Sequence, residues 1–206
     1  MKRMERHDRD AADADATALG GVDAYEPLSV PGAARPDVAT LHVTVRYLTL
    51  RPQDRPKIRP SRVSSARWSP SVITYRQLHQ QVGGDCCWWM ERARPEDAQA
   101  ARLREAGRSV HMLYARNQCI GYFELLRMPS HSTHLCYFGL YPKYRGRHLG
   151  RDALQEALLL TDPAVPVTLT TSSLDSPRAL PLYLDAGFRE SHVDEQIWDV
   201  PREFLP

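Results

Sequence analysis

The stretch YPKYRGRHLGRDALQEALLL, residues 141–160, decides the fold. It opens with a basic, glycine-containing turn and continues with apolar residues at helical spacing, which place one side of a helix in the core. The segment HLCYFGLYP (134–142) precedes it and is almost wholly apolar, as expected of a buried strand. VPVTLTTSSL (165–174) follows and alternates as a strand does. Together these segments predict one strand–helix–strand crossover.

The turn before this helix has the composition of an anion-binding site. The first N–H groups of a helix have no internal partner and carry partial positive charge. Gly146 and Gly150 let a ligand approach the main chain, while Arg145, Arg147 and Arg151 raise the positive potential. Such a site suits phosphate or pyrophosphate. It is not a P-loop, because no Gly-Lys-Ser/Thr follows, and the dinucleotide-binding pattern GxGxxG is absent.

Further strands and helices surround this crossover. Alternating or apolar segments predict strands over 41–50, 109–115, 119–128 and 192–200, the middle two forming a hairpin. Helices are predicted over 69–85, 94–107 and 176–188. In the first helix Ile73 is expected to share the buried face of Tyr75, and in the last Ser176 is expected to be the N-cap and Pro181 to bend the chain. This order of elements predicts a mixed α/β domain.

Composition divides the chain into a tail and one domain. Residues 1–38 are charged, rich in Ala and Asp, and predicted to be disordered, whereas residues 39–206 are predicted to form a single domain. Within it, residues 51–69 form a basic, proline-rich connector, either a solvated spacer or a lip over an anionic ligand or RNA. The formal net charge of +2 gives no general reason to expect a nucleic-acid or membrane partner.

The chain carries no recognisable address or metal motif. It has no apolar run of membrane-spanning length and no secretion signal, so a cytoplasmic location is expected. The four cysteines form no C-x-x-C pair, and no histidine cluster has the spacing of a zinc site. Reduced thiols and no metal are therefore expected.

Two motifs carry a resemblance to a known family. Arg145-Gly146-Arg147-His148-Leu149-Gly150 resembles the Q/R-x-x-G-x-G/A signature of the GNAT superfamily, the acyl-CoA-dependent N-acyltransferases. The segment from Ser176 to Phe188 resembles its second signature, N-x-x-A-x-x-x-Y-x-x-x-G-F. The resemblance covers roughly residues 72–200. Two positions depart from it, because His148 replaces the middle glycine and Ser176 replaces the usual asparagine.

The resemblance implies a fold, a cofactor and a reaction. The fold would have a central, mostly antiparallel sheet, helices on both faces and one β-α-β crossover that holds acyl-CoA. The reaction would be acetyl transfer from acetyl-CoA to a primary amine by direct attack in a ternary complex. Tyr183 would lie near the thioester sulfur, where a phenol can protonate the departing thiolate. The residues expected at the cofactor are Gly139, Leu140, Arg145, Gly146, Arg147, His148, Leu149, Gly150, Arg151 and Ser176.

The acceptor amine must lose a proton before it attacks, which calls for a base. Glu124 is the predicted base, because a carboxylate within an apolar strand is costly to bury unless it is paired or used. It could instead pair with Arg116 or Arg127, and water or another side chain could be the base. Three histidines are expected to be solvated rather than catalytic: His111, His131 and His134. Three aromatic residues are candidates to line the acceptor pocket: Trp88, Trp89 and Tyr137.

Other functions fit the same sequence. A GNAT-like chain could be a non-catalytic or CoA-sensing binding module that acts through a macromolecular partner. The acceptor could also be a protein or an RNA-linked amine steered by the basic connector. An exposed edge strand could pair two copies of the chain in a homodimer.

Overall fold

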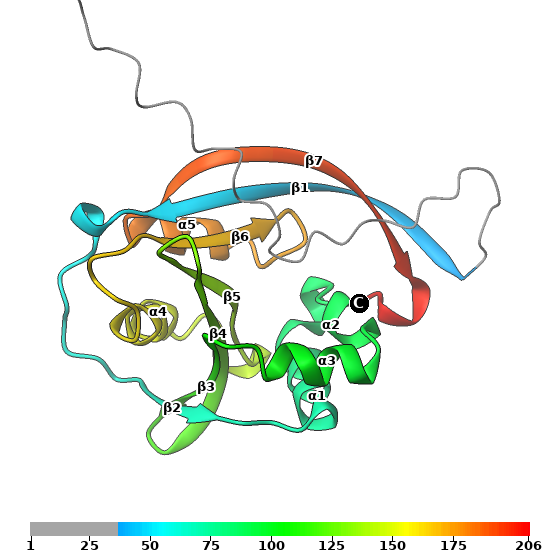
Figure 1. Cartoon of the computed structure of the whole chain (residues 1–206), viewed down its shortest axis with the longest axis horizontal. Coiled ribbons are helices and arrows are strands. Elements are labelled where there is room, and N and C mark those ends of the chain that lie inside the picture. Colours follow the sequence, from blue (N-terminus) through cyan, green and yellow to red (C-terminus); the bar gives the residue numbers. More distant parts are fainter. Residues whose placement is uncertain (1–36) are drawn as a thin grey trace, which may run out of the picture. The chain divides into compact units, whose positions relative to one another are not determined.

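The computed structural model describes residues 37–206, which contain a seven-stranded mixed sheet in the order β2-β3-β4-β5-β6-β1-β7 (Figure 1). The strands are β1 (Val38–Leu50), β2 (Ser64–Trp68), β3 (Arg108–Ala115), β4 (Gln118–Met128), β5 (Ser132–Leu140), β6 (Val167–Ser172) and β7 (Arg189–Pro201). Only β5 and β6 pair in parallel within this sheet. The predicted class, a mostly antiparallel sheet with one crossover, is confirmed. The predicted tail lies outside the described residues except for its last two, where β1 begins.

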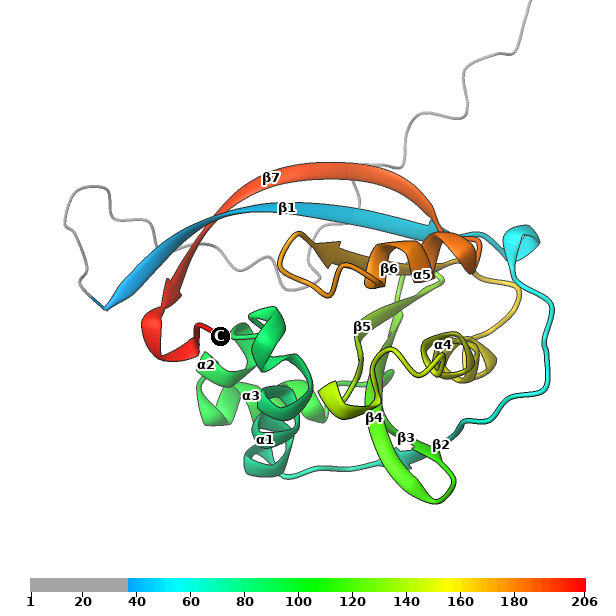
Figure 2. The ribbon, with the colours of Figure 1, turned by 180° about the vertical axis from the view of Figure 1, so that it is seen from behind.

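Helices cover both faces of the sheet (Figures 1 and 2). One face carries α1 (Val72–Gly83), α2 (Met90–Ala93) and α3 (Glu96–Leu103), and the other carries α4 (Gly150–Leu159) and α5 (Ala179–Asp185). Four short 3-10 turns complete the described elements: η1 (Pro52–Asp54), η2 (Gly84–Cys86), η3 (Pro142–Tyr144) and η4 (Arg202–Phe204). Leu154 of α4 packs in one buried cluster with Leu113 of β3, and Tyr75 of α1 packs in another with Val110 of the same strand. The two faces of β3 therefore serve two separate cores.

The strands of the crossover stay paired over only a short distance. The parallel pairs are Thr133 with Val167 and His134 with Thr168. The ladder between β4 and β5 then shifts register around Cys136, a bulge that bends β5. Beyond it, β5 and β6 run apart (Figure 1). We call the region between residues 135–140 of β5 and 169–172 of β6 the strand gap.

The first strand of the domain lies between the last two. β1 pairs antiparallel with β6 over residues 45–50 and with β7 over residues 38–49. β1 and β7 therefore form a long curved ribbon that extends beyond β6 (Figure 2). Val43 and Leu50 are fully buried, so β1 is a central strand rather than an edge.

The basic connector runs along α4 and is bonded to it. The guanidinium of Arg55 donates to the carbonyl oxygens of Leu158 at 3.3 Å and Asp162 at 2.8 Å, and so satisfies groups at the C-terminal end of the helix. The backbone of Arg59 exchanges two hydrogen bonds with the side chain of Gln155, at 2.9 and 2.7 Å. Residues 64–68 of the same segment form β2, an edge strand that sequence reasoning missed and that begins after the last of the three prolines.

The predicted helices form, with two differences in detail. Ile73 was predicted on the buried face of α1, but it is 64% exposed, because a position two residues from Tyr75 points to nearly the opposite side. His79 is buried in its place. The N-cap of α5 is Arg178 rather than Ser176, so that prediction is wrong. Pro181 is consequently the third helical residue, where its missing N–H breaks no internal hydrogen bond and the predicted bend has no cause.

Candidate active site

The turn from Arg145 to Gly150, here called the phosphate loop, presents unused backbone donors. Gly146 has a φ of +72° and His148 a φ of +58°. No side chain caps the N-terminus of α4. Within the described chain, the N–H groups of residues 146–149 donate no backbone hydrogen bond. The loop therefore holds several amides that a phosphate group can accept from, beside the positive end of α4.

His148 occupies a backbone conformation that favours glycine. Its φ of +58° lies in the left-handed region, where a side chain costs free energy. Arg62 of the connector holds this conformation, because its guanidinium donates to the carbonyl oxygen of His148 at 2.5 Å. The same guanidinium forms an ion pair with Asp152 of α4 at 2.9 Å. The imidazole of His148 is exposed, so its backbone rather than its side chain is built into the loop.

The cations around the loop differ from those that the sequence suggests. The guanidinium of Arg145 turns away to bond Asp85 at 2.5 and 2.9 Å and the carbonyl oxygen of Leu140 at 3.0 Å. It therefore ties the end of β5 to the segment after α1. Arg178, which sequence reasoning missed, lies over the loop, since a Cβ built at Gly146 would be 2.7 Å from its Nη1. Its position two residues after Ser176 in the second motif was the only available signal.

Trp88 stands at the strand gap, whereas Trp89 does not. The indole of Trp88 packs on Gly139 of β5, where a Cβ would be 3.1 Å from its ring. Its Nε1 donates to Asp175 at 3.1 Å, and this carboxylate also accepts from the backbone of Ser172 at the end of β6. Trp88 thus connects the two separated strands. Trp89 is 3% exposed and belongs to a different buried cluster beside the β1–β7 ribbon.

Tyr183 faces β5 from α5. Its ring makes edge contacts with Phe138 at 6.2 Å and with Phe188 at 5.9 Å between centroids. Burial, and then the negative charge of Asp175, raise the pKa of the Tyr183 phenol. The phenol is therefore protonated at neutral pH, as a proton donor must be.

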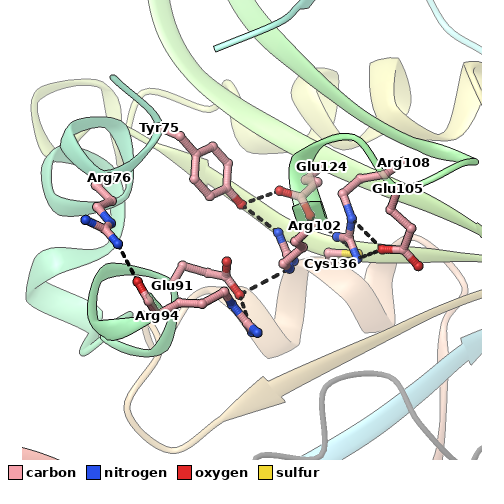
Figure 3. A network of polar contacts seen from close by, with 9 residues as sticks. All are labelled: Tyr75, Arg76, Glu91, Arg94, Arg102, Glu105, Arg108, Glu124 and Cys136. Atoms are coloured by element: carbon pink, nitrogen blue, oxygen red, sulfur yellow. Dashed lines mark hydrogen bonds and ion pairs between the residues drawn. The ribbon is translucent and has the colours of Figure 1, made fainter. Parts of the chain in front are cut away.

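Glu124 lies at the centre of a buried network rather than in an open pocket (Figure 3). Its carboxylate is fully buried and accepts from the hydroxyl of Tyr75 and from Arg108, and it pairs with Arg102 at 2.8 Å. These partners differ from Arg116 and Arg127, the ones that its position in the sequence suggests. Arg102 extends the network to Glu91 at 3.3 Å. Burial lowers the pKa of Arg102, but Glu124 together with Tyr75, Glu91 and Tyr137 outweighs that effect, so the net pKa is raised and the guanidinium stays charged.

The three histidines that were expected to be solvated differ in their exposure to solvent. His131 is exposed at the β4–β5 turn, as predicted. His111 is 8% exposed and stacks on Phe123 with 5.0 Å between ring centroids, which contradicts the expectation. His134 is partly buried, and its Nδ1 is 2.9 Å from the hydroxyl of Thr168. A cavity of about 280 Å³ lies at the β2–β3 edge, on the far side of β4 from the strand gap, and is lined by Trp68, Leu103 and Val110 among others rather than by His111.

Comparison with known proteins places the chain in a family. A profile described as "Acetyltransferase (GNAT) domain" matches residues 76–199. The chain therefore belongs to the GNAT acetyltransferase family. No curated protein matched it.

Solved structures support the same fold. A GCN5-related N-acetyltransferase from Kribbella flavida is 15% identical with a TM-score of 0.51, over 79% of this chain and 60% of that one. A tandem GNAT protein from the clavulanic acid biosynthesis pathway is 15% identical with a TM-score of 0.51, over 76% and 53%. A conserved protein of unknown function from Staphylococcus epidermidis is 12% identical with a TM-score of 0.51, over 79% and 63%. The chain thus spans less than two thirds of the length of each of these three structures.

The described residues show neither a metal-binding group nor a membrane-spanning helix. Among them, no three His, Cys, Asp or Glu side chains are grouped so that they could hold a metal ion. None of the helices in residues 37–206 has the length and apolar character needed to cross a membrane.

Proposed function

We propose that the protein transfers an acetyl group from acetyl-CoA to a primary amine. The observation that carries this proposal is the phosphate loop, with its unused amides at the uncapped N-terminus of α4. That loop lies directly after the strand gap in a chain of the GNAT family. Both the donor and the acceptor are substrates, and they would meet at the end of β5.

The residues present fit acetyl-CoA. The amides of residues 146–150 would hold the pyrophosphate, and Arg147, Arg151 and Arg178 would supply positive charge around it. Arg145 would act indirectly, because its contacts keep the end of β5 in place. Gly139 and Leu140 would present the strand edge to the pantetheine arm.

The chemical roles follow from position and protonation. Tyr183 would give its proton to the departing thiolate. Glu124 was predicted to accept the amine proton, but both its oxygens are bonded to protein groups, so it could reach that proton only through the hydroxyl of Tyr75. A backbone N–H near Leu140 would stabilise the charge that develops on the thioester oxygen.

The proposal is tested by calorimetry with acetyl-CoA and by acetyl transfer on a panel of primary amines. Gly146→Asp adds bulk and negative charge at the loop and is expected to weaken acetyl-CoA binding, while Tyr183→Phe is expected to slow single-turnover transfer with binding intact. If Gly146→Asp binds acetyl-CoA as tightly as the wild type does, then acetyl-CoA binds at a different place from the phosphate loop. An unchanged rate in Tyr183→Phe would leave this residue a packing role only. Glu124→Gln with normal turnover would remove Glu124 from the mechanism.

A second candidate is a CoA-binding module without catalysis. The observation that favours it is the indole of Trp88, which lies on Gly139 where the acceptor would meet the thioester. Tight binding of acetyl-CoA without transfer to any amine, or hydrolysis, would support this candidate over the enzyme.

A further inference from the structure

Four aromatic rings meet beneath the end of β5. We call them the aromatic box: His79 of α1, Trp88 after η2, Tyr122 of β4 and Tyr137 of β5. The centroid of the His79 ring is 4.4 Å from that of Tyr137, 5.6 Å from that of Tyr122 and 5.8 Å from that of Trp88. His79 and Tyr122 are fully buried, whereas Trp88 and Tyr137 are partly exposed. The box therefore has an inner wall, formed by His79 and Tyr122, and an outer wall, formed by Trp88 and Tyr137.

The inner wall carries polar atoms without partners. Both ring nitrogens of His79 and the hydroxyl of Tyr122 are buried and form no hydrogen bond with the described chain. Oε2 of Glu91, whose negative charge acts on the phenols of Tyr122 and Tyr137, is in the same condition, and this side chain is 1% exposed. Native proteins satisfy nearly all their buried polar groups. This concentration of unpartnered atoms at one place indicates that a polar ligand belongs there.

The box adjoins the place where the thioester would lie. The indole of Trp88 covers Gly139 at the end of β5, and it also covers Gly83 at the end of α1. A side chain at either glycine would collide with the ring or its surroundings. The indole of Trp88 therefore contacts both the end of β5 and, through its rings' contacts with His79 and Tyr122, the inner wall.

The indole of Trp88 would have to turn away to open the box. Its side chain is tethered to the neighbouring strand by one hydrogen bond, from Nε1 to Asp175 at 3.1 Å. The preceding residue, Cys87, has a φ of +56°, which is strained for a residue with a side chain. The segment around it connects the short elements η2 and α2. A rotation of Trp88 would expose the nitrogens of His79 to the end of β5.

The surroundings keep the imidazole of His79 neutral. Titratable groups contact or act on it from its own helix and from four other elements: Tyr75 of α1, Arg92 of α2, Arg102 of α3, Tyr122 of β4 and Tyr137 of β5. The carboxylates of Glu91 and Glu124 pair with Arg102 behind them. Burial, followed by the positive charges of Arg102 and Arg92, places the pKa of His79 well below its usual value. A neutral imidazole has a free lone pair that can take a proton from a bound ammonium, whose own pKa the same burial lowers.

Two kinds of group at the box attract an ammonium, and they oppose the positive charges of Arg102 and Arg92. The faces of aromatic rings attract cations, and Tyr122 and Tyr137 provide two of them once the indole of Trp88 has turned away. The unpartnered Oε2 of Glu91 adds a negatively charged acceptor. A compact primary ammonium on an unbranched carbon, which takes the space of the indole, would donate to the acceptors among these atoms: the unprotonated ring nitrogen of His79, the hydroxyl oxygen of Tyr122 and Oε2 of Glu91.

We propose that the aromatic box binds the ammonium group of the acceptor in place of the Trp88 indole, and that His79 is the catalytic residue that takes its proton. This inference rests on the proposed acetyl transfer. One N–H proton of the ammonium passes to a ring nitrogen of His79, and the freed lone pair forms the C–N bond with the thioester carbonyl carbon. The C–S bond breaks, the thiolate receives a proton from Tyr183, and the second N–H proton of the new amide restores that phenol. His79 returns its proton to water, so each turnover releases one proton.

The first experiment compares His79→Gln with His111→Gln in the full chain. His111 is a buried histidine that stacks on Phe123 and lies outside the box, so it is a matched control. Butylamine is the acceptor, and acetyl-CoA affinity is measured separately by calorimetry. His79→Gln is expected to lower kcat at least 100-fold and to abolish the fall of kcat/KM at low pH, with the acetyl-CoA Kd changed less than threefold. His111→Gln is expected to stay within threefold in all three measurements. If His79→Gln fails to fold, His79→Phe keeps a ring in the same space without nitrogens.

The second experiment detects the ammonium without catalysis. Butylammonium is titrated into the protein, with and without CoA, while tryptophan emission is recorded. A saturable change that disappears in Trp88→Phe and persists in the control Trp198→Phe would support the box.

The outcomes separate the two proposals. Acetyl-CoA that fails to bind, with a Trp88-specific response to butylammonium, would end the proposed function and leave the ammonium site standing. Transfer that proceeds normally in His79→Gln but is lost in Glu124→Gln would overturn the role of His79. A titration without any Trp88-dependent signal would overturn the site.

Discussion

Replacing His148 by glycine is expected to stabilise the protein without weakening its hold on acetyl-CoA. His148 has a φ of +58° in the phosphate loop, where glycine is the residue that fits without strain. The carbonyl oxygen that Arg62 bonds and the N–H that is proposed to bind a phosphate both belong to the backbone. The substitution therefore removes strain and an exposed imidazole but keeps the groups that build the site.

The size of the effect follows from two opposing terms. The left-handed conformation costs a residue with a side chain about 1–2 kcal/mol. Glycine loses more freedom on folding than other residues, which costs about 0.5–1 kcal/mol. The expected net gain in the free energy of unfolding is about 0.5–1 kcal/mol, or about 1–4 °C in Tm for a domain of this size. The strain is present with and without the ligand, so the Kd for acetyl-CoA should change less than about threefold.

Thermal unfolding measures Tm, and calorimetry measures the Kd for acetyl-CoA. His131→Gly is a matched control, because His131 is also exposed and has a φ of +57° but lies at the β4–β5 turn. It should raise Tm by a similar amount and leave the Kd unchanged. His148→Ala removes the imidazole and keeps the strain, so Tm should not rise. A Tm for His148→Gly no higher than that of wild type would refute the strain argument, and a Kd raised more than tenfold in both variants of His148 would show that the imidazole itself binds the phosphates.

Three other perturbations have defined outcomes. Glu124→Gln leaves two buried guanidiniums facing a neutral amide and should lower the free energy of unfolding in urea by about 3–5 kcal/mol. Glu105→Gln, at a half-exposed partner of the same network, should lower it by less than about 1 kcal/mol, and equal losses would contradict the burial argument. Arg178→Ala should weaken acetyl-CoA binding about tenfold by calorimetry, whereas Arg145→Ala should chiefly lower Tm. The reverse pattern would show that Arg145, rather than Arg178, binds the phosphates. The lowered pKa of His79 means that the unfolded chain binds more protons below pH 6.5, so the urea midpoint should fall as pH drops from 6.5. His79→Phe should flatten that slope, and an unaltered slope would assign it to other groups.

Patterns within short segments determined the crossover and its turn. Helical periodicity follows from contacts three and four residues apart, and strand alternation from contacts two apart, so both are visible in the sequence around residues 134–174. The order strand, phosphate loop, helix and strand therefore could be predicted, and with it the family. Pro181 shows the limit of such patterns, because a shift of two residues in the start of α5 changed an expected bend into an ordinary first turn.

The tertiary structure alone decided which distant residues meet. Glu124 finds Arg102 and Arg108 because α3 and β3 pack against its strand, and no local spacing predicts that pairing. The insertion of β1 between β6 and β7 joins residues about 150 apart in the sequence, as Thr44 and Glu195 show. Trp88 likewise packs on Gly139 of β5, 51 residues further along the chain, because glycine has no side chain to block the indole. The sequence by itself thus determined the local conformations and the loop suited to an anion. Close packing then determined the neighbours, because the core admits only the arrangement in which volumes and charges of remote segments match.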